Sequence, residues 1–397
     1  MNRLNELIQE FCPNGVEYKK VKGAFRRLRG TPITAGKMKE IEDPNGEIKI
    51  FAGGKTIINA KEEDIPNANI TRVPAVLVQS RGVIDIVYYD KPFTFKNEMW
   101  AYTADNEIEV KYLYYILKNN IQTFRDAASG MGSLPQISLP VTEDFRIPLP
   151  PLPVQQEIVH ILDSFTELTA ELTAELAARR KQYEYYRDEL LRQGTITHYG
   201  KIIDMLVQPI TDGPHTTPTL VEKGIPFLSA EAVFDGRIHF NKKRGFITEE
   251  FDSECCRKYK PQRDDVLMVK SGSTTGKVGY VDTDERFNVW SPLAAMRVNA
   301  KNSPRFLFHL LQSEHVQKQV RTKASHGSQP NLSMRALEQF DVPIPSFDVQ
   351  EEIAAVLDNL DALCNDLASG LPAEIAARQK QYEYYRDKLL TFKELEG

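Results

Sequence analysis

The clearest pattern of apolar side chains in this chain is a run of alternating four- and three-residue spacings that ends at Leu190. Apolar residues at this spacing form one seam along a helix, so the run predicts a coiled-coil helix from about Val154 to Arg192. At about 1.5 Å per residue, this helix would be roughly 58 Å long. Only Thr169 and Arg179 interrupt the seam, whose members are Ile158, Leu162, Phe165, Leu172, Leu176, Tyr183, Tyr186 and Leu190.

The end of this helix is repeated near the end of the chain. Lys181–Leu191 returns as Lys380–Leu390, with ten of eleven positions identical. Prolines between positions 148 and 153 prevent a helix before the first copy, although Pro153 suits a first helical turn. Before the second copy, Asp348 followed by Glu351 predicts the N-terminal cap. The alternative is that both stretches are ordinary amphipathic helices on a globular core.

The second helix contains four extra residues within Ala368–Ala373, because the offset between the copies rises from 195 to 199 there. Four residues is the length of a coiled-coil stutter, which would leave the helix continuous. Gly370 and Pro372 instead favour a real break, with glycine ending one helix and proline beginning the next. We expect the break, and the stutter remains the alternative.

Two longer stretches, each before one of these helices, have mixed patterns and resemble each other only in places. Apolar runs bounded by turn residues predict strands at Ala75–Gln79, Val83–Tyr89, Val266–Val269 and Val278–Val281. Helical spacing predicts helices at Val110–Asn119 and Pro304–Val320. The segments that resemble each other are Leu77–Ser80 and Met268–Ser271, Met99–Trp100 and Val289–Trp290, and Tyr112–Leu117 and Phe306–Leu311.

A repeat with a period near half of the chain length indicates two similar units rather than a solenoid of short repeats. We therefore expect four parts: a mixed domain at residues 1–146, a helical part at 147–193, a second mixed domain at 194–341 and a second helical part at 342–397. The chain of 397 residues is long enough for two ordinary domains.

Charge is distributed unevenly over these parts. The net charge is −5, but the two mixed domains have +1 and +3 and the two helical parts have −3 and −6. A protein that binds DNA alone is expected to be far more basic. If these domains bind DNA, partners must supply most of the positive charge that neutralises phosphate.

Catalytic and metal-binding signatures are missing from the sequence. Ser271–Val278 differs from a phosphate-binding loop in its glycine spacing and in its last residue, Val278. The Asn/Asp-Pro-Pro-Tyr/Phe element expected of an amino-methyltransferase is not present. Cys12, Cys255, Cys256 and Cys364 lack metal-ligand spacing, and we expect reduced thiols in the cytosol. We find no apolar run long enough for a membrane span or a signal peptide.

Basic side chains in polar loops of the mixed domains are candidates for contacts to bases or phosphates. For any single one of them, an ordinary solvated surface charge is the favoured interpretation. The candidates are Arg26, Arg27, Arg29, Arg81, Lys96, His215, Lys242, Lys243, Arg244, Lys270 and Arg321.

The order of the repeated motifs resembles a known family. In both halves a G-S-x-P-x-x-S segment (Gly132–Ser138 and Gly327–Ser333) is followed by a P-x-P stretch, then by V-Q-x-E-I, and finally by K-Q-Y-E-Y-Y-R-D. This order is similar to that of the specificity subunits of type I restriction-modification systems, as are Asn2–Ile8 and Cys12–Glu17 at the start. The resemblance covers essentially the whole chain.

The resemblance implies an α+β protein in which two target-recognition domains are separated by two long helices that form an antiparallel coiled coil. Each domain would read one half of an interrupted DNA sequence, and the helices would fix the gap. The chain would have no catalytic site. Helix packing and subunit docking are expected of Tyr183, Tyr186, Leu190, Tyr382, Tyr385 and Leu389, together with the neighbouring Tyr185 and Tyr384.

The resemblance also implies partners and cofactors. Two methylation subunits would bring S-adenosylmethionine and flip the adenine that is methylated at N6. Two restriction subunits, which use ATP and Mg²⁺, would join in systems that cut DNA. This chain would hold no cofactor and no metal. Two other functions stay open: a self-contained methyltransferase of unfamiliar type, and a coiled-coil scaffold for protein partners.

Overall fold

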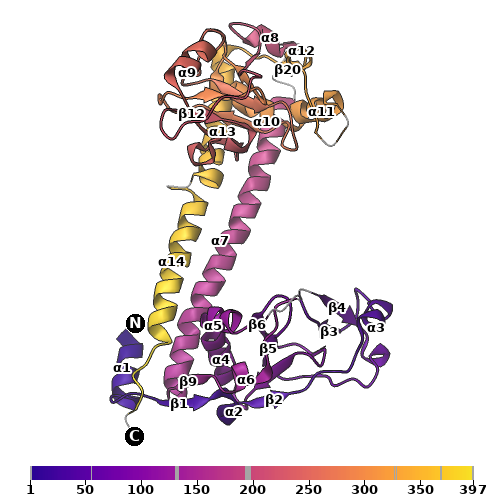
Figure 1. The fold of residues 1–397 in the computed structure, drawn as a ribbon, viewed down its shortest axis with the longest axis vertical. Coiled ribbons are helices and arrows are strands. Elements are labelled where there is room, and N and C mark those ends of the chain that lie inside the picture. Colours follow the sequence, from indigo (N-terminus) through magenta and orange to yellow (C-terminus); the bar gives the residue numbers. More distant parts are fainter. Residues whose placement is uncertain are drawn as a thin grey trace. The chain divides into compact units, whose positions relative to one another are not determined.

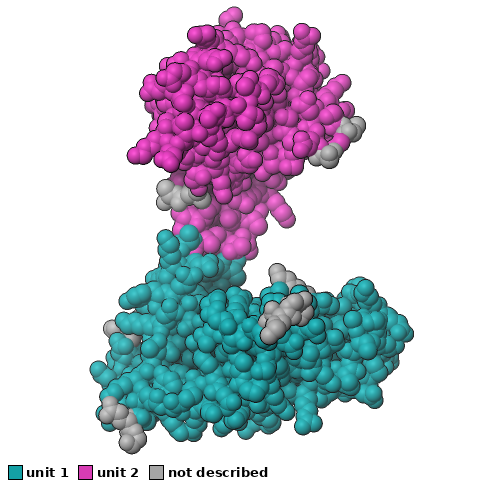
Figure 2. Space-filling model, in the orientation of Figure 1, with its two compact units in different colours: residues 1–171, 376–397 teal, residues 172–375 magenta. Residues whose placement is uncertain are grey.

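The computed structural model describes residues 2–54, 56–129, 134–192, 198–325, 327, 329–366 and 369–395. The chain divides into two compact units, shown in different colours in Figure 2. Unit 1 contains residues 1–171 and 376–397, and unit 2 contains residues 172–375. Both boundaries lie inside long helices, α7 (Leu152–Arg192) and α14 (Leu371–Leu389). Each unit contains one mixed α/β domain together with parts of these helices.

The mixed domain of unit 1 is built around a four-stranded sheet and a three-stranded sheet (Figure 1). The larger sheet is antiparallel, with the order β2 (Arg26–Leu28), β8 (Trp100–Thr103), β5 (Ala75–Gln79) and β6 (Asp85–Tyr89). The smaller sheet has the order β4 (Ile57–Ala60), β3 (Ile48–Phe51) and β7 (Phe93–Phe95), and its β3 and β7 are parallel. The predicted strand at Ala75–Gln79 is thus confirmed, and the one at Val83–Tyr89 begins two residues later.

The central strand β5 is buried on both faces, which explains its continuous apolar sequence. Val76 and Val78 face a core shared with α4 (Glu107–Asn119), the predicted helix. Leu77 faces the second sheet and packs with Phe51 and Phe93. Period-two alternation therefore places successive residues in two different cores.

The mixed domain of unit 2 repeats this architecture. Its larger sheet has the order β11 (Thr211–Asp212), β19 (Leu293–Met296), β16 (Val266–Val269) and β17 (Val278–Tyr280). Its smaller sheet has the order β15 (Gly245–Ile247), β12 (Ile225–Leu228) and β18 (Asn288–Val289), again with one parallel pair. The connection from β12 to β15 is longer than residues 52–56 of unit 1. It carries η2 (Ala230–Ala232), the hairpin β13 (Val233–Phe234) and β14 (Arg237–Ile238), and η3 (Phe240–Lys242).

Each mixed domain is closed by pairing its first strand with its last. In unit 1, β1 (Glu17–Lys20) pairs with β9 (Arg146–Leu149). In unit 2, β10 (Tyr199–Lys201) pairs with β20 (Asp341–Pro343). The remaining helices of unit 1 are α1 (Asn2–Phe11), α2 (Val21–Ala24), α3 (Ala35–Glu40), η1 (Glu62–Asp64), α5 (Ile121–Asp126) and α6 (Leu139–Glu143). Those of unit 2 are α8 (Ile202–Met205), α9 (Glu249–Cys256), α10 (Pro304–Gln312), α11 (Glu314–Lys323), α12 (Met334–Glu338) and α13 (Phe347–Asn365).

The helix predicted at Pro304–Val320 is two helices. Ser313 ends α10, and its hydroxyl accepts a hydrogen bond from the backbone N–H of Val316 at the start of α11. Serine competes with helical backbone bonding by forming such caps, so one apolar pattern can contain a break.

The helical parts pair in an antiparallel way. In unit 1 the first half of α7 packs against the end of α14, where Phe165 stacks on Tyr385 at 5.8 Å between ring centroids. In unit 2 the last part of α7 packs with α13, and Tyr183 shares a core with Leu357 and Cys364. The seam prediction is correct for Ile158 and Leu162, which are buried. It is wrong for Tyr186, which is 42% exposed, because the helix turns Leu191 inward instead.

The second helical part is broken, as expected from Gly370 and Pro372. Helix α13 ends at Asn365 and α14 begins at Leu371, while Leu367 and Ala368 lie outside the described residues. A side chain at Gly370 would meet the carbonyl oxygen of Ala362 at 2.6 Å, so glycine is needed at the break. The cap predicted at Asp348 is wrong. Ser346 precedes the helix, and Asp348 lies in the first turn, where its negative charge interacts favourably with the helix dipole.

The registers of the strands correct two of the sequence matches between the halves. Leu77 pairs with Ala101 and faces the second sheet, and Leu267 pairs with Ala295 and does the same. Leu77 therefore corresponds to Leu267 rather than to Met268. A shift of one residue would move every side chain of the strand to the other face.

Trp100 also has a different counterpart from the one predicted. Ala101 and Ala295 pair with the corresponding residues Leu77 and Leu267, so Trp100 corresponds to Ala294 and Met99 to Leu293. Trp290 instead follows β18 and matches Lys96, which follows β7. The match between Tyr112–Leu117 and Phe306–Leu311 is confirmed, since they form the corresponding helices α4 and α10.

Corresponding glycines follow the first strand of each larger sheet, and both allow a close approach. A side chain at Gly30 would lie 2.1 Å from the carbonyl oxygen of Phe95, and one at Gly213 would lie 1.8 Å from that of Val289. We expect Gly30→Ala and Gly213→Ala each to lower the free energy of unfolding by about 2 kcal/mol or more, because backbone must move. Urea titration will measure this.

Gly36→Ala is the matched control. Gly36 lies in α3 and has no atom within 4 Å of an added side chain, so the free energy of unfolding should rise by up to about 1 kcal/mol. Equal effects at all three positions would contradict the steric explanation.

Candidate nucleic-acid interface

Loops from several strands meet at one end of the two sheets in unit 1. We call them the strand-end loops of unit 1: residues 29–32, 52–54, 80–82 and 96–98, which follow β2, β3, β5 and β7. Backbone hydrogen bonds join them, from Thr31 to Phe95 (2.7 Å), from Gly54 to Arg81 (2.8 Å) and from Lys96 to Phe51 (2.9 Å). The loops therefore form one continuous surface on a rigid sheet frame.

Unit 2 has the corresponding strand-end loops at residues 212–215, 229–231, 270–272 and 290–292. The same kind of bonding joins them, from Ser291 to Pro214 (3.3 Å), from Lys270 to Pro292 (2.8 Å) and from Trp290 to Leu228 (2.9 Å). The two units thus build equivalent surfaces from different residues.

The repeated G-S-x-P-x-x-S segments hold these loops in place. In unit 1 the backbone N–H of Gly82 donates to Pro135 (2.8 Å) and that of Ile137 donates to Ser80 (2.9 Å). In unit 2 the corresponding pairs are Gly272 with Pro330 (2.9 Å) and Leu332 with Lys270 (2.7 Å). Gly132, Ser133 and Ser328 lie outside the described residues. The described part of the motif is therefore a clamp on the loop after the central strand.

Of the basic residues predicted in unit 1, three lie in the strand-end loops. Arg29 and Arg81 are exposed, and neither has an ion pair within the described residues. Lys96 is half-buried and pairs with Glu98 at 2.9 Å. Arg26 and Arg27 lie on β2 and pair with Asp105 (3.6 Å) and Glu143 (3.2 Å). Arg29 and Arg81 are thus the unpaired cations of this surface among the five candidates.

Two of the basic residues predicted in unit 2 are bound to a carboxylate that the prediction missed. Asp212 is 1% exposed; its Oδ2 lies 3.2 Å from His215 Nε2 and 3.4 Å from Lys270 Nζ, and Lys258 donates to Oδ1. Burial alone would raise the pKa of Asp212, but the hydrogen bond from Lys258 and the nearby positive charges lower it. Asp212 therefore lies within ion-pair distance of three basic groups, of which Lys258 alone donates a hydrogen bond to it.

The other candidates in unit 2 precede β15, apart from one. Lys242 is exposed, and the ammonium group of Lys243 lies 4.8 Å from the centre of the Phe246 ring. The guanidinium carbon of Arg244 lies 3.9 Å from the centre of the Trp290 ring. Arg321 lies on α11, where it pairs with Glu314, and is not part of the strand-end loops.

The same frame positions carry different chemistry in the two units. Arg29 and Asp212 both directly precede the glycine that follows the first strand. Lys96 and Trp290 both donate their backbone N–H to the end of the neighbouring strand. Charge is reversed at the first position, and at the second an ion-paired lysine is replaced by an aromatic ring.

Sequence reasoning missed Asp212, Lys258 and Trp290. An Asp-Gly-Pro turn marks Asp212, but no local pattern shows that it is buried. Lys258 follows α9 and comes from 46 positions away along the chain. Only the tertiary fold brings these side chains together.

Each mixed domain is attached to its helix through an aspartate. In unit 1, Asp163 of α7 accepts hydrogen bonds from Lys111 (3.0 Å) and Tyr115 (2.5 Å) of α4. In unit 2, Asp358 of α13 binds Arg305 and His309 of α10, with His309 Nε2 at 2.7 Å. These groups are hereafter called the aspartate joints.

The pKa values in the joint of unit 2 follow from its burial. Burial lowers the pKa of His309, despite the nearby carboxylate. Burial raises the pKa of Asp358, but hydrogen bonds from His309 and Arg305 outweigh it, so the net shift is downward. His309 Nδ1 lies 2.9 Å from the hydroxyl of Tyr183 on α7, which ties a second helix to the joint.

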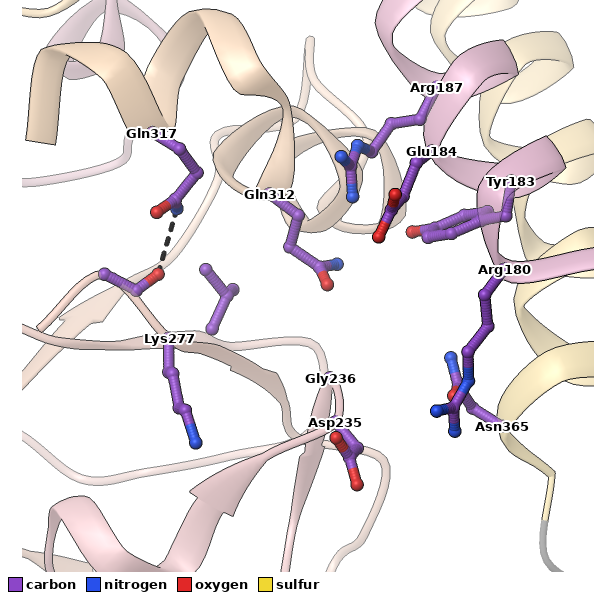
Figure 3. Close-up of a pocket in the computed structure, with 12 residues that line it drawn as sticks. Arg180, Tyr183, Glu184, Arg187, Asp235, Gly236, Lys277, Gln312, Gln317 and Asn365 are labelled. Carbon is purple, nitrogen blue, oxygen red and sulfur yellow. Dashed lines mark hydrogen bonds between the residues drawn. The ribbon is translucent and has the colours of Figure 1, made fainter. Parts of the chain in front are cut away.

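A hollow of about 370 Å³ in unit 2 lies beside this contact (Figure 3). Arg180, Tyr183, Glu184 and Arg187 of α7 line one side of it, and Lys277 and Asp235 line the other. Gln317 closes one end by donating to the carbonyl oxygen of Gly276 at 2.9 Å. Its wall carries both signs of charge, so it does not resemble a phosphate site.

The residues predicted for helix packing and docking fall into two groups. Tyr183 and Leu389 are buried, while Leu190, Tyr382 and Tyr385 are half-buried against the two cores. Tyr186 is 42% exposed, and Tyr185 and Tyr384 are each 63% exposed. Packing therefore accounts for the first group, whereas the second group is largely exposed.

Within the described part of the chain, no group of three or more His, Cys, Asp or Glu side chains is arranged to hold a metal ion. In the same described residues, no helix has the length and apolar content needed to cross a bilayer.

Comparison with known proteins decides the family. The model of the type I restriction modification DNA specificity domain matches residues 15–179 and 216–377. The chain belongs to this family. It is 33% identical over 301 residues to the EcoR124I/EcoR124II type I restriction enzyme specificity subunit of Escherichia coli, and the match covers 72% of each chain. The resemblance seen in the motifs is thereby confirmed.

Solved structures support the fold. The S subunit of a type I restriction-modification system from M. genitalium covers 95% of this chain and 96% of its own, with a TM-score of 0.60 and 16% identity. A chain from a structure of type I R-M complex assembly has a TM-score of 0.57 and 17% identity, and covers 95% of this chain and 98% of its own. At this level of identity the likeness concerns the fold, which agrees with the two-domain α+β class predicted.

The aspartate joint of unit 2 predicts a dependence of stability on pH. Because burial lowers the pKa of His309, the unfolded chain binds a proton more readily, so the stabilisation present above about pH 6.5 is lost as the pH falls below it. We expect the free energy of unfolding to fall between pH 7.5 and 5.5, by no more than about 1.4 kcal/mol per pH unit for this one group. Urea titration at both pH values will test this.

The control is His309→Tyr, which introduces the residue found at the corresponding position of unit 1, Tyr115. In His309→Tyr the fall over this pH range should be smaller, since tyrosine does not titrate there. An unchanged fall would show that another group is responsible. The lowered pKa of Asp358 adds a further loss only at more acidic pH.

Proposed function

We propose that this chain selects the DNA sequence for a type I restriction-modification complex, with each unit reading one half of an interrupted site. The observation that carries the proposal is the pair of strand-end loop surfaces, built on one frame with different side chains. A single fold with two different reading surfaces suits a target whose two halves differ. The exposed Arg29 and Arg81 in unit 1 and Arg244 in unit 2 supply donors suited to base edges and phosphates.

The proposal assigns recognition to residues 1–146 and 194–341, and spacing to the helical residues 147–193 and 342–397. Helix α7 is continuous over 41 residues and takes part in both units. Two weak half-site contacts on one chain act at high effective concentration, provided that their separation matches the DNA. A helix that does not bend or stretch easily meets this condition.

Two methylation subunits are the proposed partners of the helices. The repeated segments Lys181–Leu191 and Lys380–Leu390 expose the corresponding tyrosines, Tyr185 and Tyr384, to the same extent. Exposed tyrosine is enriched at protein interfaces. Two copies of one surface suit two copies of one partner, and two restriction subunits join where the system has them.

The chemistry is proposed to belong to these partners. S-adenosylmethionine, ATP and Mg²⁺ would bind there, and this chain would be non-catalytic. The positive charge that the mixed domains lack, at +1 and +3, would also come from the partners.

Reconstitution with the methylation subunits tests the proposal. The complex should methylate adenine in one bipartite sequence, mapped over a genome by single-molecule sequencing. The purified chain alone should not bind S-adenosylmethionine in calorimetry. Binding by the chain alone would favour a self-contained methyltransferase, and a complex without sequence-dependent DNA retention would favour a scaffold.

Changing the length of α7 should change the tolerated gap. Inserting or deleting one helical turn near Leu172 alters the helix by about 5.4 Å, which corresponds to one or two base pairs at about 3.4 Å each. Methylation mapping should show an altered gap with both half-sequences unchanged. Altered half-sequences with the original gap would contradict the proposed role of the helix.

Removing the exposed tyrosines should weaken docking without unfolding the chain. We expect Tyr185→Ala and Tyr384→Ala each to weaken binding of a methylation subunit about tenfold or more, as truncation of aromatic interface residues does. Titration calorimetry measures the affinity. Val207→Ala is the control, because Val207 is 58% exposed but lies outside the repeated segments. Equal effects of all three substitutions would contradict the docking role.

A further inference from the structure

The residue that follows the parallel strand of the smaller sheet, β7 in unit 1 and β18 in unit 2, differs between the units. In unit 1 this residue is Lys96, and its charge is paired with Glu98 at 2.9 Å. In unit 2 the corresponding residues are Trp290 and Pro292, so the pair is replaced by an aromatic ring and a proline. Arg244 lies over this ring, with its guanidinium carbon 3.9 Å from the ring centre.

The contact with the ring leaves the hydrogen-bond donors of Arg244 free. A guanidinium group is planar and donates through its edge, while its face stacks on aromatic rings. Arg244 is exposed, and no described residue forms a hydrogen bond or ion pair with its guanidinium. The side chain is therefore held in orientation without using its donors.

The backbone fixes the base of both side chains. The N–H of Arg244 donates to Phe227 (2.9 Å), and that of Trp290 donates to Leu228 (2.9 Å), the next residue of β12. Arg244 and Trp290 thus start from adjacent positions at the end of one strand. An arginine supported in this way loses less conformational entropy on binding than a free one.

The environment of Trp290 is energetically unfavourable for its indole N–H, and packing alone does not explain why a tryptophan lies there. Its indole N–H is buried and has no hydrogen-bond partner in the described residues, although buried tryptophan usually has one. An unpaired buried donor is unfavourable, so a tryptophan kept only for stability would be expected to bond there. Support of Arg244 gives this residue a reason to be present.

We propose that Arg244, held over the ring of Trp290, reads a guanine in the half-site of unit 2 through two parallel hydrogen bonds. The bidentate pairing of arginine with O6 and N7 of guanine matches its free edge. This inference rests on the proposed function and names a residue and a base within it. Trp290 is a positioning residue, since it acts through Arg244.

The test uses the complete complex with its methylation subunits and maps methylated sites over a genome. Arg244→Ala should relax one G·C position in one half-site by about tenfold or more, with the other half-site and the gap unchanged. Arg244→Lys should relax the same position, because lysine keeps the charge but not the paired donors. Trp290→Ala should relax it too, and Trp290→Phe should relax it less.

Arg263→Ala is the matched control, because Arg263 is an exposed arginine of the same unit that is paired with Asp284. It should leave the site unchanged. The inference is overturned if neither half-site contains a G·C pair that Arg244→Ala relaxes. It is also overturned if Arg244→Ala weakens DNA binding equally at all sequences while Arg244→Lys restores it, which would indicate a phosphate contact.

The outcome for the wild-type complex separates this inference from the proposed function. A wild-type complex with no bipartite methylation site would refute the function itself. A wild-type complex with such a site that Arg244→Ala leaves intact would refute only the role of Arg244. Measuring the thermal midpoint of each variant guards against loss of folding as the cause.

Discussion

The attachment of each mixed domain to a helix through one aspartate is the contact on which the rest of the structure depends. Asp163 and Asp358 occupy corresponding positions, and each binds a cation and a second donor from the domain helix packed against it. A partly buried carboxylate with such partners is costly to leave unpaired, so the contact fixes direction as well as distance. The chemistry of the second donor differs, tyrosine in unit 1 and histidine in unit 2, but the geometry is kept. A domain that reads DNA at a set spacing needs this kind of rigid attachment.

Rigidity in the frame allows variety in the loops. The sheets, the close glycines and the clamp after the central strand are common to both units, whereas Arg29 faces solvent where Asp212 is buried in the other unit. Much of the positive charge of unit 2 is bound internally: Asp212, Asp252 and Asp265 are all buried and pair with lysine or arginine. These structural ion pairs engage many of the cations of unit 2 and leave few free ones to define a binding surface. The free ones gain importance for that reason.

The sequence predicted the larger features well because they arise from local patterns. The repeated helix ending, the break at Gly370, the central strands at Ala75–Gln79 and Val266–Val269, and the family itself all follow from spacing or motif. Errors occurred where a short segment has no local signal for its register or end. Matching Leu77 to Met268 was one residue out, and Trp100 was matched to Trp290, because similar letters do not show which face of a sheet a side chain meets.

By itself, the sequence determined a duplicated α+β chain with two long helical parts, since apolar periodicity and repetition are properties of the chain alone. It also listed the basic residues available for DNA, but it did not rank them. Only the tertiary structure decided that Lys96, Lys270 and Arg321 are paired with carboxylates while Arg29, Arg81 and Arg244 keep their donors free. The physical reason is that ion pairing and ring stacking depend on distances between residues far apart along the chain, such as Arg244 and Trp290, and no spacing rule encodes those distances.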